Sequence, residues 1–412
     1  MKQPRLAERS RDGADRGGGG LRVCMVHYSD FTVDSRIQRQ ARALAERGDR
    51  VDCVCINDDT EFAVGPGRIA LHRAAAGKPR GGKRAYLEGN ARFLAGAARK
   101  VAALDRHNRF DLIEIHNMPD ALVFTALGPK LRGTPLILNF HDTFPELFAT
   151  LFGRSSRDPL VRLVRAEERL SAAVADGHVF VTAEARDLLA ARGVTAERTQ
   201  IVMNTPDERV FGERREPLAL PREGPLRVVY HGGLAARFGV ETLVRAVAML
   251  RERDAEVELD VYGSDAEAAR TLAARAAELA PAGVRIAPQP TPVEQIPARL
   301  QEAHLGVVPT RRDHFTELLL PVKLLEYVHM GLPVVASRLP VIERYFGDDV
   351  LLAEPGDPGS IAAAIEGIRA DPTLARERAE RASRKLAEIE WRRQRQGYLE
   401  LVDGLVERAR RR

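Results

Sequence analysis

The sequence is poor in cysteine and in aromatic residues, and it has no long apolar run. Three cysteines occur among 412 residues, and an odd number in a long chain argues against a disulfide framework. No stretch approaches the roughly 20 apolar residues of a membrane-spanning helix. The first twenty residues are polar and end in four glycines, without the apolar core of a secretory signal. We therefore expect a globular cytoplasmic protein with a flexible tail at residues 1–20.

Motifs for bound cofactors and metals are also missing. Neither the GxGxxG dinucleotide fingerprint nor the GxxxxGK[ST] phosphate loop occurs, which argues against dehydrogenases and nucleoside triphosphatases. No Asp-x-Asp pair occurs, so a carboxylate clamp for a divalent cation is not expected. Cys53 and Cys55 have no nearby histidine or cysteine quartet, and we interpret them as buried apolar residues. The sequence predicts no metal and no cofactor.

The charge balance is only slightly basic. Lysine and arginine number 63 against 58 acidic residues, and aromatic residues make up 5% of the chain. Basic stretches lack interleaved aromatics, so nucleic acid is not the expected partner. Basic residues gather at 78–100. Two interpretations stay open for this segment: an amphipathic helix in peripheral contact with anionic lipid, and a solvated helix face.

Short apolar runs alternate with longer amphipathic ones along the whole chain, which is typical of parallel βαβ units. The strands expected in the first half are 22–26, 51–55, 111–116, 135–140, 177–182 and 200–203, and those in the second half are 226–231, 256–263, 284–287, 304–309, 332–337 and 350–353. Between the halves, residues 206–225 are rich in proline and charge and have no sustained period. We predict two α/β domains, 21–205 and 226–385, joined by this linker.

A helical segment follows at 386–412, carries the only tryptophan, Trp391, and could pack back on the first domain. In tandem α/β domains, ligands bind where the carboxyl ends of parallel strands face each other. We therefore expect the site in a cleft between the domains.

The stretch HGGLAARFGV at 231–240 follows one expected strand and precedes a helix. Gly232 and Gly233 would let the backbone approach a ligand closely, and the helix start would offer free N–H groups to an anion. Arg237 would add a full positive charge. The competing interpretation is a tight turn without a ligand.

The stretch PVKLLEYVHMG at 321–331 places a lysine and a glutamate three residues apart. Pro321 suits the first helical position, and Lys323 would lie in the first turn, where free N–H groups favour phosphate. Glu326 would share that side of the helix. Lys323 on a diphosphate and Glu326 on a ribose diol would form a nucleotide clamp, and a surface ion pair is the competing interpretation.

Taken together, these motifs resemble glycosyltransferase family 4, the retaining group with the GT-B fold of two Rossmann-like α/β domains facing across a cleft. Residues 321–337 resemble its P-x-K-L-x-E-Y-x-x-x-G-x-P-V-V-A-S run, and 230–239 its Y-H-G-G-L and R-x-G pattern. The first half, at 34–54 and 116–147, resembles the envelope-polysaccharide type. Residues 202–211 and 354–365 resemble its interdomain asparagine motif and its late turn and helix.

The resemblance implies transfer of a hexosyl group from a UDP- or GDP-sugar to a saccharide or lipid-linked acceptor, in cell-envelope polysaccharide or glycoconjugate synthesis. The missing Asp-x-Asp pair leads us to expect metal-independent transfer, and the basic segment 78–100 would suit a lipid-linked acceptor at the inner face of the cell membrane. The nucleotide sugar is a substrate, not a cofactor. The expected catalytic residues are His141, Asp142, Arg237 and Lys323; the expected donor-binding residues are Asn204, Gly232, Gly233, Arg237, Glu317, Leu318, Lys323 and Glu326; and Asp34, Arg36, His116 and Asn117 are expected on the acceptor side.

The sequence departs from the family pattern at Leu318, where many members carry a glutamate that touches the sugar. The neighbouring Glu317 is a possible substitute, with a shifted backbone. His141 can also be interpreted as a histidine satisfied by backbone, and Asp34 with Arg36 as an ion pair inside a loop. For the whole chain, three more functions stay open: a nucleotide-sugar epimerase or hydrolase of the same fold, a non-catalytic nucleotide-sugar binder, and a nucleic-acid binder.

Overall fold

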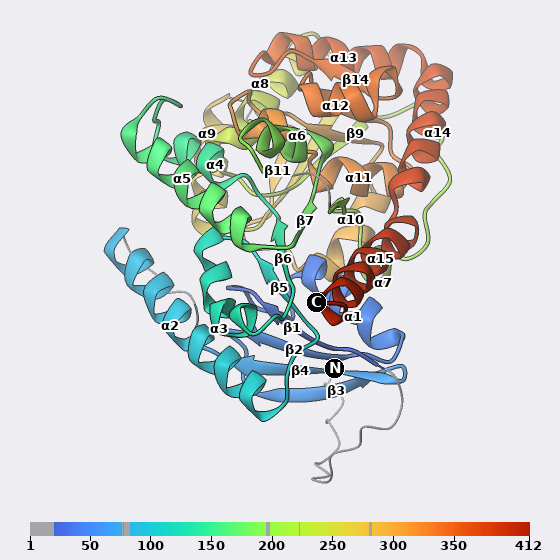
Figure 1. Cartoon of the computed structure of the whole chain (residues 1–412). Helices are drawn as coiled ribbons and strands as arrows, with labels where there is room; N and C mark the ends of the chain where they lie inside the picture. The colour runs from blue at the N-terminus through green and yellow to red at the C-terminus, as the bar shows by residue number, and fades with distance from the viewer. Residues whose placement is uncertain (1–19, 76, 78–82, 195–197, 222, 280–281) are drawn as a thin grey trace.

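The computed structural model describes residues 20–75, 77, 83–194, 198–221, 223–279 and 282–412. Residues 1–19 of the predicted tail and 78–82 of the basic segment lie outside the described residues. The chain forms two α/β domains, each built on its own parallel sheet, as the alternating pattern predicts (Figure 1). Every expected strand is present, although several begin or end a residue or more from the predicted bounds.

The first sheet has eight strands in the order β3-β4-β2-β1-β5-β6-β7-β8, and all neighbours are parallel except β3 and β4. Its strands are β1 (Arg22–Val26), β2 (Arg50–Cys55), β3 (Thr60–Val64), β4 (Gly67–Arg73), β5 (Leu112–His116), β6 (Leu136–Phe140), β7 (Gly177–Phe180) and β8 (Thr199–Ile201). The β3–β4 hairpin is not among the strands expected from the sequence. Strand β3 is an edge strand with only Val64 buried, so it lacks the apolar pattern that reveals an inner strand.

The helices of the first domain cover both faces of this sheet. They are α1 (Ser35–Glu46), α2 (Lys83–His107), α3 (Leu127–Leu131), α4 (Phe144–Leu151), α5 (Pro159–Val174) and α6 (Ala183–Ala191), with the 3₁₀ helix η1 (Asp120–Ala126) before α3. Helix α1 buries Ile37, Ala41 and Leu44, which confirms the predicted apolar face. Its N-cap residue is Asp34, so the polar loop after β1 leads directly into the helix.

The second sheet has six strands, all parallel, in the order β11-β10-β9-β12-β13-β14. Its strands are β9 (Leu226–Gly232), β10 (Val257–Gly263), β11 (Val284–Ile286), β12 (Leu305–Val308), β13 (Val334–Ser337) and β14 (Leu351–Ala353). Its helices are α8 (Val240–Arg251), α9 (Ala266–Leu279), α10 (Ile296–Gln301), α11 (Val322–His329), α12 (Pro340–Tyr345) and α13 (Pro358–Ala370). The short α7 (Glu208–Phe211) lies on the crossing between the domains.

The last two helices return from the second domain to the first. Helix α14 (Pro372–Ile389) runs down the side of the second domain, and α15 (Trp391–Arg410) lies against the first (Figure 1). The hydroxyl of Tyr398 on α15 donates a 2.6 Å hydrogen bond to the buried carboxyl of Glu114 on β5. The two domains are therefore linked by the chain twice, at the 206–225 crossing and at the α14–α15 junction.

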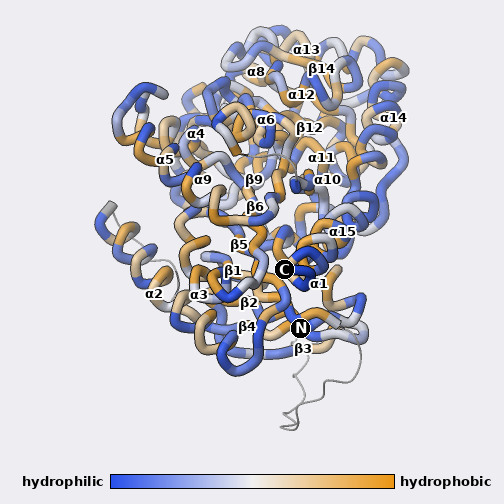
Figure 2. Tube along the Cα trace, in the orientation of Figure 1, coloured by the Kyte–Doolittle hydropathy of each residue, from blue (hydrophilic) through white to orange (hydrophobic). Residues whose placement is uncertain are grey.

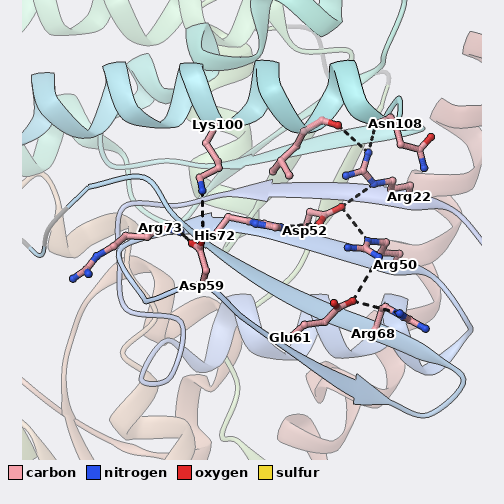
Figure 3. A network of polar contacts seen from close by, with 11 residues as sticks. Arg22, Arg50, Asp52, Asp59, Glu61, Arg68, His72, Arg73, Lys100 and Asn108 are labelled. Atoms are coloured by element: carbon pink, nitrogen blue, oxygen red, sulfur yellow. Dashed lines mark hydrogen bonds and ion pairs between the residues drawn. The ribbon is translucent and has the colours of Figure 1, made fainter. Parts of the chain in front are cut away.

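A polar network inside the first domain surrounds Asp52 of β2 (Figure 3). Its fully buried carboxylate accepts from Arg22 Nε at 2.9 Å and contacts His72 Nε2 at 2.8 Å. Burial alone would raise the pKa of Asp52, but the His72 hydrogen bond and the arginine charges lower it below its ordinary value. Three neighbouring strands, β1, β2 and β4, are thereby joined by side chains as well as by backbone.

Among the described helices, none combines the length and the apolar character needed to cross a bilayer.

Candidate active site

The candidate site lies where strand ends of the two domains meet. Thr182, just after β7, donates its hydroxyl to the carbonyl of Leu318 in the second domain at 3.1 Å. Arg344 of α12 forms a 3.0 Å ion pair with Glu184 of α6. The carboxylate of Asp142, after β6, is close enough to Arg237, after β9, for that arginine to lower its pKa. The predicted residues of both halves are therefore brought together across one interface.

Two glycines shape the loop after β9. Gly232 has a φ of +103°, which favours glycine, and a Cβ there would lie 3.4 Å from the amine of Lys323. Gly239 has a φ of +70°, and a Cβ would lie 1.8 Å from the carbonyl of Pro309. The loop needs these glycines for close approach of its own chain. This observation agrees with the tight-turn interpretation. The lack of a side chain at Gly232 also leaves the space beside Lys323 open.

Lys323 packs against aromatic rings of the same loop. Its Nζ donates a 2.6 Å hydrogen bond to the hydroxyl of Tyr230 and lies 4.2 Å from the centre of that ring. The Phe238 ring contacts two cations, with Lys323 Nζ at 4.7 Å and the guanidinium of Arg237 at 4.8 Å from its centre. Burial lowers the pKa of Lys323 to about 7, against the opposing charge of Glu326. Arg237 and Lys323 thus flank one aromatic ring.

Lys323 and Glu326 do not form the surface ion pair that was the competing interpretation. Helix α11 begins at Val322, with Pro321 as its N-cap residue rather than its first helical residue. The carboxylate of Glu326 contacts His231 Nε2 at 3.1 Å, while Lys323 bonds to Tyr230. Both side chains point to the end of β9, and both are largely buried. This is the side of the helix that faces the glycine loop.

The remaining predicted donor residues are spread more widely. Glu317 lies 3.5 Å from Arg312 and is part-exposed, whereas the Leu318 carbonyl contacts the first domain. Asn204 is half-buried on the crossing between β8 and α7. The carboxylate of Glu317 is therefore within ion-pair distance of Arg312.

On the first domain, two histidines form a buried pair. His116 Nδ1 and His141 Nε2 are 2.9 Å apart, and their rings are stacked. Burial lowers the pKa of both imidazoles well below their ordinary value, so both are neutral near pH 7. Among the described residues, no backbone group accepts from or donates to the His141 ring. The interpretation of His141 as a histidine satisfied by backbone is therefore wrong.

Asn117 fixes the loops after β5 and β6. Its amide oxygen accepts from the His141 N–H at 2.8 Å, and its amide nitrogen donates to the Asp142 carbonyl at 2.8 Å. The same nitrogen donates to Asp120 at 2.9 Å. Asn117 is thus a positioning residue that holds the backbone of His141 and Asp142.

Asp34 and Arg36 form an ion pair inside their loop, which was one of the two interpretations open for them. Arg36 donates to both carboxylate oxygens of Asp34 at 3.0 Å, and Arg36 outweighs burial to lower the pKa of Asp34 below its ordinary value. Burial raises the pKa of Asp142 to about 6, although Arg36 and Arg237 both act to lower it. The charges of one arginine from each domain therefore act on the Asp142 carboxyl.

Four residues of the site were not among the predicted ones: Glu114, Tyr230, His231 and Phe238. Three of them, Tyr230, His231 and Phe238, lie within the 230–239 stretch that the sequence singles out, and His231 is the last residue of an expected strand, so proximity to a strand end was the available signal. Glu114 gave no such signal, because it lies inside the β5 strand. Its oxygen lies 3.9 Å from His116, and burial raises its pKa to about 7.

No cluster of three or more histidine, cysteine, aspartate or glutamate side chains suited to a metal ion occurs in the part of the chain that the structure describes. The chemistry available at the site consists of two cations beside a glycine loop, a carboxyl with a raised pKa, and a neutral histidine pair.

Family models match both domains. Residues 32–205 match the model described as a glycosyl transferase 4-like domain, and residues 225–371 match the model described as glycosyl transferases group 1. The first range covers the first sheet except β1, and the second range covers the whole second sheet.

Several known proteins are similar to this chain. A D-inositol 3-phosphate glycosyltransferase of Pseudarthrobacter chlorophenolicus is 24% identical over 390 residues, covering 90% of each chain. Sucrose-phosphate synthase from Thermosynechococcus elongatus superposes with a TM-score of 0.73 at 20% identity, covering 94% of this chain and 100% of that one. A trehalose-6-phosphate structure from E. coli bound with UDP-2-fluoro glucose gives a TM-score of 0.67 at 14% identity, covering 94% and 99%. With both domains matched and the fold shared, this chain belongs to glycosyltransferase family 4 and has the GT-B fold.

Proposed function

We propose that this glycosyltransferase moves a hexosyl group, with retention of configuration, from a UDP-sugar to a saccharide or lipid-linked acceptor of the cell envelope. The observation that carries the proposal is the pair of basic side chains beside the loop after β9, with Lys323 Nζ at 4.7 Å and the Arg237 guanidinium at 4.8 Å from the centre of the Phe238 ring. A donor phosphate on Arg237 and an acceptor on the first domain would then meet at Asp142. The E. coli neighbour bound with UDP-2-fluoro glucose and an Anabaena neighbour in complex with UDP support a uridine nucleotide.

In this proposal the donor diphosphate lies at the loop after β9, with Lys323 and Arg237 neutralising its charge and Glu326 accepting from the ribose hydroxyls. The bond from the sugar to the diphosphate breaks, and its electron pair stays on the phosphate oxygen. Preorganised positive charge stabilises that leaving group, so the residues present suffice without a metal. The acceptor hydroxyl attacks on the same face and passes its proton to the departing oxygen. Asp142 and His141 orient the two sugars.

The donor is identified by thermal shift with UDP-, GDP-, ADP- and dTDP-sugars. A ligand that binds only the folded chain stabilises it by about 3 kcal/mol at a hundredfold excess over Kd. We expect the largest shift with a UDP-sugar, and the variant Glu326→Ala should lose it. If no nucleotide sugar shifts the transition, the donor site is assigned wrongly.

The acceptor is tested with the donor so found. Transfer to a saccharide or lipid-linked saccharide supports a transferase, whereas free sugar without a glycosylated product indicates a hydrolase. A Burkholderia xenovorans neighbour is in complex with glucose-6-phosphate, so sugar phosphates belong among the acceptors assayed.

We also propose peripheral membrane contact at the cytoplasmic face, with residues 78–100 as one contributing segment. On its described part, Arg84 and Arg92 both reach Glu88, at 2.9 and 3.7 Å, while Leu87 is exposed. Glu88 partly neutralises the charge of these two arginines. We therefore expect this segment to contribute less to membrane binding than its number of basic residues suggests.

A further inference from the structure

Helix α5 (Pro159–Val174) carries apolar residues on the face that points away from the domain. The residues of this outer face recur at spacings of four and three, and they are Pro159, Leu163, Ala166, Leu170 and Ala173. Leu163 is 64% exposed and Leu170 is 59% exposed. The buried face contains Val161 and Ala172 together with Glu168 and Ser171. Helix α5 therefore carries apolar residues on both faces, whereas an ordinary surface helix keeps its apolar side toward the core.

The end of α4, the residue after it and the first turn of α5 add three more exposed apolar side chains, Leu151, Phe152 and Leu160. Five of the eleven large apolar side chains that are exposed among the described residues therefore fall between Leu151 and Leu170. Such a concentration marks a contact surface, whereas single exposed apolar residues are ordinary. Figure 1 shows this helical hairpin projecting from the same side of the molecule as the end of α2, and Figure 2 shows apolar and polar stretches alternating along it. We call the exposed apolar residues of α4, α5 and the turn between them, from Leu151 to Ala173, the α4–α5 surface.

Arg162 and Arg169 border the outer face of α5, and they differ from the neighbouring arginines in their ion pairs. Arg165 and Arg192 are paired with Glu146, and Arg192 also with Glu168. In the described part of the chain, no carboxylate lies within ion-pair distance of Arg162 or Arg169. Both line an open hollow of about 670 Å³ between α5 and α6. A guanidinium without a carboxylate partner is suited to bind phosphate.

A row of phenylalanines connects this surface to the candidate active site. Helix α4 begins at Phe144, two residues after Asp142. The ring centres of Phe144 and Phe148 are 6.2 Å apart, and those of Phe148 and Phe152 are 4.7 Å apart. Because the three rings follow one side of α4, an apolar path leads from the loop of Asp142 to the exposed turn.

We propose that the α4–α5 surface docks on an anionic lipid bilayer and that the phenylalanine row receives the apolar tail of a membrane-held acceptor. Leu160, Leu163 and Leu170 would enter the boundary between headgroups and acyl chains, with Arg162 and Arg169 on lipid phosphates. The part that concerns the acceptor rests on the proposed function, and the docking part does not. A symmetric pairing of two copies through this face would bring like-charged arginines together, so charge complementarity favours the bilayer.

Flotation with vesicles tests the docking. We expect the full chain to float with vesicles of phosphatidylcholine and phosphatidylglycerol, to float poorly with phosphatidylcholine alone, and to be released by high salt. Arg162→Gln with Arg169→Gln should weaken binding by about fivefold for each arginine. Leu160→Ser, Leu163→Ser and Leu170→Ser together should abolish flotation. The matched control is Leu374→Ser with Arg384→Gln on α14, an exposed leucine and an exposed arginine of the second domain.

Unchanged flotation of the triple leucine variant would overturn the docking surface. A shift from dimer to monomer in that variant by analytical ultracentrifugation, without lipid, would overturn it as well, because a second copy would then be the occupant. Calorimetry with UDP-glucose on the same variants separates this result from the proposed function. If the wild type floats but binds no nucleotide sugar, the docking surface is supported and the proposed function is rejected. If it binds a nucleotide sugar but does not float, only the docking surface is rejected.

The phenylalanine row is tested with octyl glucoside below its micelle concentration, by saturation-transfer NMR. We expect the signal from the alkyl chain to fall severalfold in Phe148→Ser, while methyl glucoside gives little signal with either protein. Equal alkyl signals in the wild type and the variant would overturn the role of the row and leave the docking result untouched.

Discussion

The second domain presents two basic side chains beside one aromatic ring, and burial lowers the pKa of one of them, Lys323, to about 7, whereas the first domain presents a neutral histidine pair and a buried carboxyl. Lys323 and Arg237 both lie on the ring of Phe238. Across the interface, burial keeps the His116 and His141 pair neutral and raises the pKa of Asp142 to about 6. The difference indicates a division of work: one domain receives an anion, and the other orients the hydroxyl groups of the sugars.

The largest expected effect comes from removing a charge of the second domain. Lys323→Ala should lower transfer by about 10²–10³-fold, since one preorganised group on a developing charge contributes roughly 3–4 kcal/mol. Steady-state kinetics with the identified donor measures this. Lys385→Ala is the control, because Lys385 pairs with Asp349 on the surface of the same domain. A loss below threefold for Lys323→Ala would contradict the division.

In the first domain, replacing Asp142 by asparagine should lower activity and raise stability. Asp142→Asn should lower kcat by about a hundredfold with little change in donor affinity, because Asp142 orients the reacting sugars. The pKa of Asp142 is raised on folding, so its ionised form costs stability as pH rises from about 4 through about 6. We expect the variant to be about 1–2 kcal/mol more stable at pH 7.5, a value reduced for partial exposure, and equal to the wild type below pH 4. Chemical denaturation at the two pH values checks the sign.

The pH dependence of donor binding should arise from the second domain. Without a bound donor, the side chain of Lys323 has a pKa of about 7. Above that pH it is mostly neutral, so it must take up a proton when the diphosphate binds. UDP-glucose affinity should therefore fall on the order of tenfold between pH 6.5 and 8.5. Calorimetry in buffers of different ionisation enthalpy would detect the proton uptake. Lys323→Arg should remove the dependence; if it persists there, another group is responsible.

The smallest expected effect concerns Tyr230, which holds the lysine amine. Tyr230→Phe removes one hydrogen bond to Lys323 and should weaken donor binding about fivefold, equivalent to roughly 1 kcal/mol. Tyr262→Phe, a change of the same kind on the neighbouring strand β10, should have no effect. Equal effects of the two changes would show that the hydroxyl of Tyr230 does not position Lys323.

The sequence alone determined the parallel α/β architecture, because inner strands are short apolar runs and their helices have one apolar face. It also placed Gly232 and His141 at strand ends, where ligands bind in such sheets, and Lys323 in the first turn of a helix, where phosphate is favoured. The β3–β4 hairpin was missed, since an exposed edge strand carries little apolar signal.

Only the tertiary structure decided which charges meet. Glu326 contacts His231, and Lys323 contacts Tyr230, across 95 and 93 positions of sequence respectively. The outward leucines of α5 were also invisible beforehand, because periodicity shows that a helix has an apolar face and not whether that face points into the core. Period and composition are local properties of the chain, whereas burial and charge pairing depend on which distant segments pack together.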